Sequence, residues 1–326
     1  MPNVLIACAV FTTRDDTPLH TIQEAGWTVS WAPEGGLTTE DGLIDALQEQ
    51  DAVIAGGEPY TRYVMENAPQ LKHIARWGVG FDRVDLVAAT DLGVIATTTQ
   101  GGNDWGVADH AMALILGLAH RLVSNDDEVR AGTWGRPVGD DVWGATIGIV
   151  GLGRIGRGVA LRAKGFNMKV LACEPYPDQA FVAQHGIELV SLPELMSRAD
   201  YITLHSPGSA ENKHLIGKDE IARMKPTAYI VNTARGTLID EDALYPALVE
   251  RRIAGAGLDV RELEPARDTR FNGLDNVILT SHIAGVTHGT VVSMAGMTVK
   301  SILQSWRGEK PHGFLNPEVW ERRRGW

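Results

Sequence analysis

The chain has 326 residues, of which 44% are hydrophobic and 22% are charged, a composition typical of globular proteins and not of disordered ones. This length is sufficient for two domains of ordinary size. The net charge of −11 and a pI of about 5.4 argue against nucleic acid or an anionic membrane as the main partner, because both bind basic surfaces.

The cysteines and the N-terminal residues indicate a cytoplasmic protein. Cys8 and Cys173 are far apart and lack the spacing of a metal site, so we expect no disulfide framework and a reducing compartment. The first residues, MPNVLIACAVFTTRDD, lack a basic n-region, and we interpret them as a first strand and not as a signal peptide. The longest apolar helix, around Ala111–Ala119, has about half the length of a membrane span, and we therefore expect a soluble protein.

The first third of the chain alternates short apolar runs with helical patterns. One helical pattern, TTEDGLIDALQEQ, has Thr39 as a candidate N-cap. Alternating β and α segments with continuous apolar strands predict a parallel sheet that is covered on both faces. The following segment, VADHAMALILGLAHRL, is apolar on nearly every side and predicts a buried helix. The expected strands are NVLIACAV, DAVIAGG, HIARWG and GVIATT.

A second β/α series begins at Thr146 and ends near Gly285. A last helical stretch, HGTVVSMAGMTVKSILQSW, follows it. We infer an α/β protein in which the second series is inserted into a first domain and the last helix returns to that first domain. The expected strands of the second series are TIGIVG, KVLAC, YITLH, AYIVNT, AGAGLDV and NVILTS.

A glycine-rich loop, GLGRIG, follows the first strand of the second series and begins a helix. In a dinucleotide-binding loop, Gly151 permits the tight turn, Gly153 lets a pyrophosphate approach the backbone, and Gly156 lets helix and strand pack closely. The helix N-terminus supplies N–H groups for the phosphates. Glu174 stands at the end of the next strand, where a carboxylate binds ribose hydroxyls and repels the 2′-phosphate of NADP. The alternative is an ordinary tight turn with a surface glutamate.

Three candidate catalytic residues follow three other strands of this series. Arg235 follows AYIVNT, Glu264 follows AGAGLDV, and His282 follows NVILTS. In an open parallel sheet, ligands lie outside the carboxyl ends of the strands. A histidine can take the hydroxyl proton when a hydride leaves an alcohol carbon, a glutamate can orient the histidine ring, and a guanidinium can hold a carboxylate. The alternatives are a solvated arginine, a surface acid and a structural histidine.

Several long motifs occur in one order along nearly the whole chain. On these motifs the chain resembles the D-isomer-specific 2-hydroxyacid dehydrogenases, especially the branch similar to D-3-phosphoglycerate dehydrogenase. The resemblance implies two Rossmann-like or flavodoxin-like domains around a cleft: 1–104 with 286–326 as the substrate (catalytic) domain, and 105–285 as the NAD-binding Rossmann domain. It also implies a homodimer. The motifs are IARWGVGFDRVDL, VADHAMALILGLA, IGIVGLGRIG, MKPTAYIVNTARGTLIDEDAL, AGAGLDV with LEP, and NVILTSHIAG.

The resemblance also implies residue roles. Arg235 would bind the substrate carboxylate, and Glu264 would pair with the catalytic His282. No metal is implied, and the cofactor is NAD. The substrate-binding positions are Val79, Gly80 and Asn103, and the cofactor-binding positions are Gly151, Gly153, Arg154, Ile155, Gly156, Glu174, Pro207, Thr233, Asp259 and Val107.

We therefore expect hydride transfer between the nicotinamide and a small D-2-hydroxy acid or its 2-oxo acid. The segment AGGEPYT lacks the arginine-serine pair that similar phosphoglycerate enzymes often carry, so a clamp for a substrate phosphate is not expected. Two alternatives stay open: a dehydrogenase of another small anion, such as phosphite, and a non-catalytic protein that senses NAD. Formate fits poorly, because the similar formate enzymes have glutamine where Glu264 stands. The presence of Arg235, Glu264 and His282 speaks against the NAD sensor.

Overall fold

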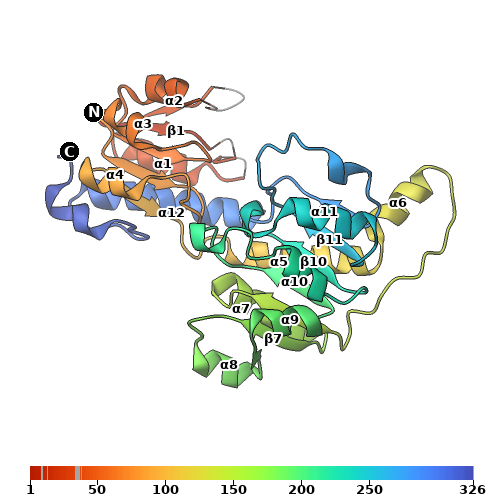
Figure 1. The fold of residues 1–326 in the computed structure, drawn as a ribbon. Helices are drawn as coiled ribbons and strands as arrows, with labels where there is room; N and C mark the ends of the chain where they lie inside the picture. Colours follow the sequence, from red (N-terminus) through yellow and green to blue (C-terminus); the bar gives the residue numbers. More distant parts are fainter. Residues whose placement is uncertain (9, 13, 34–36, 38, 326) are drawn as a thin grey trace. The chain divides into compact units, whose positions relative to one another are not determined.

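The computed structural model describes residues 1–8, 10–12, 14–33, 37 and 39–325, so the run NVLIACAV lies partly outside the described residues (Figure 1). The chain divides into two units, one made of residues 1–103 with 286–326 and the other of residues 104–285. Each unit contains one sheet whose strands are all parallel. The prediction of two parallel-sheet α/β domains is therefore confirmed.

The first unit has a five-stranded sheet of order β2-β1-β3-β4-β5, the flavodoxin-like order. Successive residues of a strand point to opposite faces, so Val4 and Ile6 pack towards α1 and α12, whereas Leu5 packs towards α2, α3 and α4. The elements are β1 (Asn3–Ile6), α1 (Thr17–Glu24), β2 (Thr28–Trp31), α2 (Glu40–Leu47), β3 (Ala52–Ala55), α3 (Arg62–Glu66), β4 (His73–Arg76), α4 (Leu86–Asp91), β5 (Ile95–Thr98), α12 (His288–Trp306) and η4 (Pro317–Arg322).

Buried polar contacts attach α12 to the sheet of the first unit. The imidazole of His73, on β4, bonds through Nδ1 to the Ser305 hydroxyl at 2.7 Å and through Nε2 to the Thr97 hydroxyl at 2.9 Å. Burial lowers the pKa of His73 to about 3, so the ring stays neutral and serves as a hydrogen-bonding core residue.

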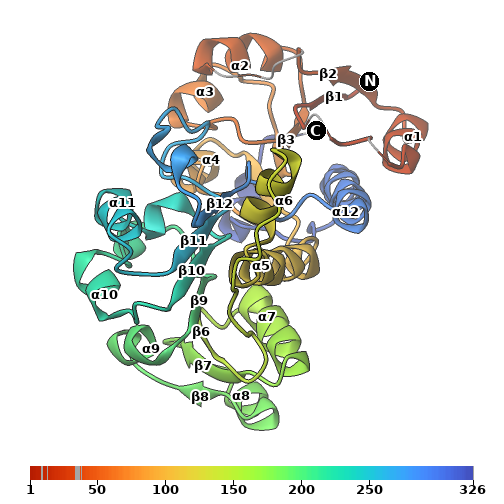
Figure 2. The ribbon, with the colours of Figure 1, turned by 90° about the vertical axis from the view of Figure 1, so that its right-hand side faces the viewer.

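The second unit has a seven-stranded sheet of order β12-β11-β10-β9-β6-β7-β8, which contains the Rossmann order with the reversal between β6 and β9. Figure 2 shows α5 and α7 on one face and α9, α10 and α11 on the other, in agreement with the two apolar clusters of this unit. The elements are α5 (Asp104–Ala119), α6 (Leu122–Arg130), β6 (Thr146–Val150), α7 (Arg154–Gly165), β7 (Lys169–Cys173), α8 (Gln179–His185), β8 (Glu188–Leu189), α9 (Leu192–Arg198), β9 (Tyr201–Leu204), η1 (Ala210–Asn212), α10 (Lys218–Arg223), β10 (Tyr229–Asn232), η2 (Gly236–Leu238), α11 (Glu241–Val249), β11 (Gly255–Leu258), η3 (Arg270–Gly273) and β12 (Val277–Leu279).

The structure differs from the expected elements at two edge strands and at the end of one helix. The edge strands β2 and β8 were not predicted, because TVSW is half-exposed and β8 has only two residues. The helix expected through Leu122 ends at Ala119, since Arg121 adopts a left-handed conformation with φ of 52° and α6 leaves at a bend of 59°. The predicted cap at Thr39 is confirmed: its hydroxyl accepts the N–H of Gly42 at 3.2 Å.

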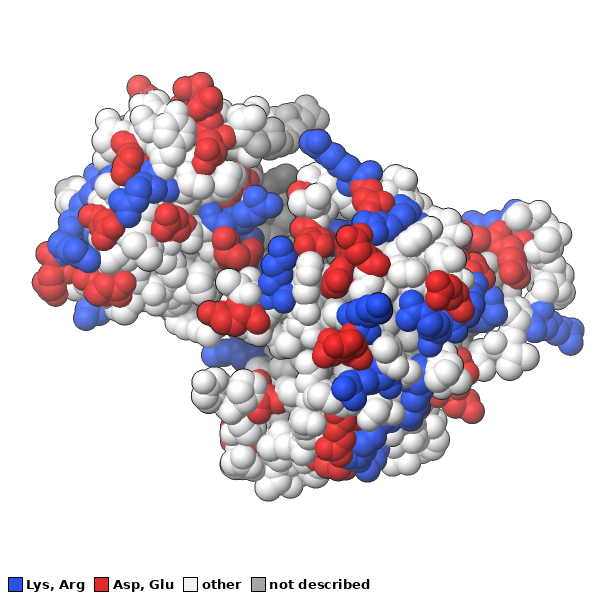
Figure 3. Space-filling view, viewed as in Figure 1, with Lys and Arg blue, Asp and Glu red and all other residues white. Residues whose placement is uncertain are grey.

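Among the described residues, no single helix is long and apolar enough to cross a membrane, although α5 and α6 together, as a bent pair, reach the required length and composition. The α5 helix is mostly buried and packs on α7 and on strands β10 to β12. On the face drawn in Figure 3, acidic and basic side chains are interspersed.

Candidate active site

The three candidate catalytic residues follow three neighbouring strands of the second unit. Arg235 follows β10, Glu264 follows β11 and His282 follows β12, and these strands pair in that order. Because parallel strands end at the same edge of a sheet, the structure brings the three side chains together. The glycine-rich loop follows β6, at the same edge, beside the reversal in strand order where α/β sheets bind ligands.

His282 and Glu264 form a hydrogen-bonded pair. The ring Nδ1 lies 2.7 Å from Oε2 of Glu264, and the two side chains are 49% and 34% exposed. Partial burial works to raise the pKa of the Glu264 carboxyl, but the His282 hydrogen bond and charge, the Arg261 N–H group and the nearby Arg235 outweigh it, so this pKa lies below its usual range. Glu264 is therefore ionised at neutral pH, and the pair leaves Nε2 of the His282 ring without a partner among the described residues.

The backbone at His282 is held in an uncommon conformation by Asp259. His282 has a φ of 56°, in the left-handed region, and its N–H donates to the Asp259 carbonyl at 2.7 Å. The fully buried Asp259 carboxylate accepts the N–H groups of Ile283 and Ala284 at 2.9 and 3.0 Å and the Thr280 hydroxyl at 2.6 Å. Asp259, assigned to the cofactor by resemblance, thus already fixes the turn that carries His282.

Arg235 packs into space left by a glycine. A Cβ atom at Gly208 would lie 2.6 Å from Cγ and 2.9 Å from Cβ of Arg235, closer than van der Waals contact allows. The half-buried guanidinium donates through Nη1 to the Ala234 carbonyl at 2.6 Å. The absence of a side chain at Gly208 therefore permits this position of the arginine.

The glycine-rich loop fits a dinucleotide. A Cβ atom at Gly153 would meet no described atom within 4 Å, which leaves room for a pyrophosphate. Gly151 has a φ of 93°, and a Cβ atom at Gly156 would lie 2.1 Å from the Gly151 carbonyl oxygen. A glycine is thus required at each of these positions for a different steric reason. The twelve-residue helix α7 begins directly after Gly153, so its N-terminal N–H groups lie beside the loop.

The acidic residue after β7 contacts the glycine-rich loop. Oε2 of Glu174 accepts the Leu152 N–H at 2.8 Å, and Oε1 accepts the Tyr176 N–H at 2.9 Å. The carboxylate is therefore held at the end of β7, beside the loop where a ribose would follow the pyrophosphate.

The remaining candidate cofactor residues of the second unit differ in exposure. The buried Thr233 hydroxyl has no hydrogen-bond partner among the described residues, as expected of a group that awaits a ligand. Arg154 is 62% exposed and lies 3.8 Å from Asp104. Pro207 is exposed, Ile155 is half-buried and Val107 is buried.

In the first unit, the candidate substrate-binding residues follow β4 and β5. Val79 and Gly80 are half-buried, and their N–H groups have no acceptor among the described residues. The Asn103 Oδ1 atom is buried and equally has no donor in the described part of the chain. Polar groups of this kind, without a partner, fit a polar ligand.

An acidic group lies at the same edge of this sheet. Glu58, just after β3, is 8% exposed and accepts the Tyr60 hydroxyl at 3.3 Å. Burial raises the pKa of the Glu58 carboxyl, although the nearby Arg76 opposes this shift. In the described residues, no group of three or more His, Cys, Asp and Glu side chains is placed to hold a metal ion.

Sequence reasoning missed Glu241 and Arg261, which form a buried ion pair behind Glu264. Arg261 directly follows the segment AGAGLDV, just as Arg235 follows AYIVNT, and this position after a buried strand is the signal that would have found it. Glu241 gives no such signal, because an acid in the first turn of a helix is common.

Comparisons with known proteins identify the family of the chain. Residues 112–284 match the family model of the D-isomer specific 2-hydroxyacid dehydrogenase, NAD binding domain. A glyoxylate reductase of Korarchaeum cryptofilum is 39% identical over 95% of this chain and 96% of its own length. A D-3-phosphoglycerate dehydrogenase of Methanocaldococcus jannaschii is 40% identical over 86% of this chain but only 54% of its own length.

The solved apo-structure of D-lactate dehydrogenase from Escherichia coli has a TM-score of 0.83 and 31% identity, covering 97% of this chain and all of that one. The fold, the glycine-rich loop and these similarities lead to one conclusion. The chain belongs to the D-isomer specific 2-hydroxyacid dehydrogenase family and is an NAD-dependent oxidoreductase that transfers a hydride between the cofactor and a hydroxy or oxo acid.

Proposed function

We propose that the protein reduces a small 2-oxo acid, with glyoxylate as the first compound to test, and that Arg235, Glu264 and His282 carry the chemistry. The 2.7 Å pair of Glu264 and His282, at the edge where Arg235 also lies, is the observation that supports this most directly. NAD, when bound, supplies or accepts the hydride. Relatives named glyoxylate reductase support a short substrate.

The residues of the second unit divide the work between binding and proton transfer. Arg235 holds the substrate carboxylate with two parallel hydrogen bonds. In reduction, Nε2 of His282 gives its proton to the carbonyl oxygen as the carbon gains a hydride, and in oxidation it takes that proton back. Glu264 fixes the ring through Nδ1 and stabilises its cation.

The two units take different roles in this proposal. The second unit, residues 104–285, binds NAD through Gly151, Gly153 and Gly156, with Glu174 on the ribose. The first unit binds the substrate through Val79, Gly80 and Asn103. A screen of glyoxylate, hydroxypyruvate, pyruvate and longer 2-oxo acids with NADH tests the proposal, and no turnover with any of them would contradict it.

We expect NADH to be preferred over NADPH. Glu174 is anchored by the Leu152 N–H at 2.8 Å, so its charge would face a 2′-phosphate. A preference of at least ~10-fold in kcat/KM follows if this repulsion costs roughly 1.4 kcal/mol. Steady-state kinetics with both cofactors provide the measurement. Glu174→Gln should lower the ratio of kcat/KM with NADH to kcat/KM with NADPH. Equal kcat/KM values for the parent would show that Glu174 does not select the cofactor.

We also expect no strong preference for phosphorylated substrates. The segment after β3 carries the buried acid Glu58, which repels a second anionic group. The ratio of kcat/KM for phosphohydroxypyruvate to that for hydroxypyruvate should stay below ~10. The reason is that no side chain of this segment offsets the free-energy cost of desolvating a phosphate. Glu58→Gln should raise the ratio. A parent ratio of several orders of magnitude would mean that another residue holds the phosphate.

The proposed partner is a second copy of this chain, with no nucleic acid or membrane involved, in the cytoplasm. Helix α6 and the segment after it extend from the rest of the second unit in Figure 1, and Trp134, Val138 and Trp143 in this region are 81%, 90% and 67% exposed. Exposed aromatic and aliphatic side chains of this size are typical of protein interfaces.

A dimer held by this segment should dissociate when its apolar side chains are removed. We expect light scattering to give twice the chain mass for the parent and a shift towards the monomer for the double variant Trp134→Ser, Val138→Ser. Val87→Ser, on the exposed face of α4 where Val87 is 70% exposed, is the matched control and should remain dimeric. A monomeric parent would contradict the proposal.

A further inference from the structure

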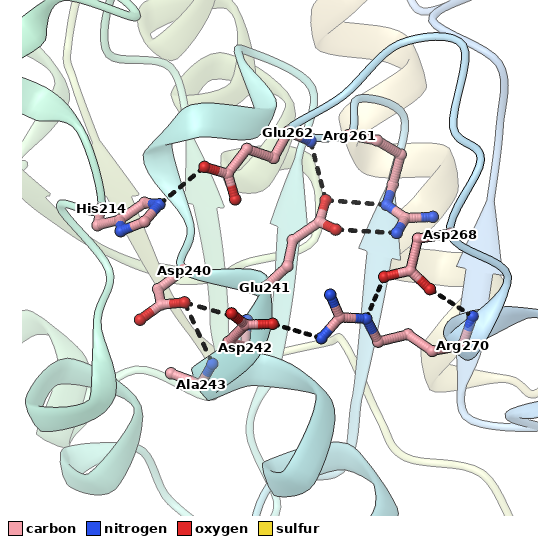
Figure 4. A network of polar contacts seen from close by, with 9 residues as sticks. All are labelled: His214, Asp240, Glu241, Asp242, Ala243, Arg261, Glu262, Asp268 and Arg270. Atoms are coloured by element: carbon pink, nitrogen blue, oxygen red, sulfur yellow. Dashed lines mark hydrogen bonds and ion pairs between the residues drawn. The ribbon is translucent and has the colours of Figure 1, made fainter.

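A buried carboxylate organises the loop that carries Glu264. Glu241, the first residue of α11, accepts three hydrogen bonds, each of 2.9 Å: Oε1 accepts Nε of Arg261 and the N–H of Glu262, and Oε2 accepts Nη2 of Arg261 (Figure 4). The Glu241 and Arg261 side chains are only 10% and 8% exposed. This is a bidentate, buried ion pair, the geometry in which an ion pair is most specific in direction.

The ion pair is connected to the acid–base pair by one further hydrogen bond. The backbone N–H of Arg261 donates to Oε1 of Glu264 at 3.0 Å, while Oε2 of Glu264 bonds to His282. The guanidinium of Arg261 also lies over the Phe271 ring, 4.6 Å from its centre. Glu241, Arg261, Glu264 and His282 thus form a continuous series of contacts from the core to the site.

The backbone of the loop also rests on the residue after Arg235. A Cβ atom at Gly236 would lie 1.9 Å from the Arg261 carbonyl carbon and 2.3 Å from the Glu262 nitrogen. The Arg235 loop and the Glu264 loop therefore touch backbone to backbone, so a shift of Arg261 would move both candidate groups.

Charged groups close to Glu264 and Glu241 influence the pKa values of both carboxyls. Glu264 faces His282 and Arg235. Burial works to raise the pKa of the Glu241 carboxyl, but the hydrogen bonds of Arg261 and of the Glu262 N–H, with the charge of Arg270, hold it below its usual range. The ion pair consequently stays charged across the pH range of an enzyme assay.

Glu264 and His282 need such support because they are partly exposed. Holding two side chains that are 34% and 49% exposed in one geometry costs side-chain entropy, which offsets part of their mutual attraction. We propose that the buried Glu241–Arg261 ion pair is a positioning device that holds the Glu264 carboxylate against His282 and the Arg235 loop. The inference rests on the proposed acid–base role of Glu264 and His282.

The test compares Arg261→Met with a matched control in the same network. Asp242→Asn removes the neighbouring contact of α11 with Arg270, whose Nη1 lies 2.6 Å from the 84% exposed Asp242, and does not touch the Glu264 loop. For Arg261→Met we expect kcat for glyoxylate reduction with NADH to fall by ~10- to 100-fold, because misplacement of a catalytic group by about 1 Å has that effect. The alkaline limb of the pH profile should also move to lower pH.

The affinity for NADH should stay nearly constant in Arg261→Met. The Kd of NADH should change by less than about twofold, since the glycine-rich loop is untouched and a tenfold change would require ~1.4 kcal/mol. Asp242→Asn should match the parent in kcat and in the position of the alkaline pH limb.

A second variant separates positioning from stability. Removing one partner of a buried ion pair destabilises a protein strongly, whereas replacing both by apolar residues is often neutral. The double variant Glu241→Leu, Arg261→Met should therefore keep a Tm near that of the parent and still show the lower kcat and the shifted pH limb. A folded double variant with the kcat and the alkaline pH limb of the parent would overturn the proposal.

The same experiments distinguish this inference from the proposed function. If His282→Ala retained the activity of the parent, the acid–base assignment itself would be wrong. If His282→Ala were inactive while the folded double variant behaved as the parent, only the positioning role of Glu241 and Arg261 would be wrong.

Discussion

Replacing His282 by alanine should lower kcat in both directions by ~100- to 10,000-fold, the usual contribution of a general acid–base group. The reason is geometric: Nδ1 of the ring is bonded to Glu264 at 2.7 Å and Nε2 is left for the substrate. Stopped-flow and steady-state rates with glyoxylate and with glycolate provide the measurement. His312→Ala, at an exposed position of the first unit, is the control and should retain the parent rates.

The pH dependence of these rates depends on Glu264. Because the pKa of its carboxyl lies below the usual range, Glu264 is charged throughout the assay, and Glu264→Gln removes a charge that favours the protonated ring of His282. Reduction needs that protonated ring, so its alkaline limb should move to lower pH. Oxidation needs the neutral ring and should reach its plateau at lower pH. Unmoved limbs, with chemistry rate-limiting, would contradict the pairing.

Arg235→Ala should lower kcat/KM by at least ~10-fold, because a charge-assisted hydrogen bond contributes roughly 1.5–3 kcal/mol. The loss should fall on the carboxylate substrate, and the Kd of NADH should change little. Initial rates over a range of glyoxylate concentrations and a fluorescence titration with NADH separate the two quantities.

Arg235→Lys tests whether the shape of the group matters. An ammonium retains the charge but not the two-pronged geometry of the guanidinium, so the lysine variant should recover only part of the lost kcat/KM. Full activity in Arg235→Ala would mean that Arg235 is an ordinary loop residue, packed beside Gly208 without a role in binding.

The repeating pattern of apolar runs predicted most of the two sheets. KVLAC and the last helix have the same bounds in the structure as in the prediction, because their apolar residues recur at the spacing of a strand and of a helix. The missed strands lie at sheet edges, where a half-exposed strand needs fewer apolar residues. The break at Arg121 was also missed, since a left-handed residue that is not glycine leaves no mark in a hydrophobic pattern.

The candidate site also has parts that the sequence pattern predicts and parts that only the folded chain defines. Arg235, Glu264 and His282 could be proposed because each follows an apolar run that predicts a strand, and parallel strands that pair end at the same edge. The Glu241–Arg261 contact could not, because it joins residues that are 20 positions apart through a packing arrangement that only the folded chain defines. A close approach such as that of Gly208 to Arg235 is likewise a property of the folded loops.

The contacts of Asp259 determine how the effect of a substitution at this residue should be interpreted. Its carboxylate fixes the turn at His282 through Ile283 and Ala284, and by resemblance it would also contact the nicotinamide. If both assignments hold, a substitution at this position should perturb proton transfer and cofactor affinity together, and a single rate measurement would not separate the two effects. A replacement of Asp259 would have to preserve both functions at once. We therefore expect a saturation library selected for turnover to contain almost no substitutions at this position.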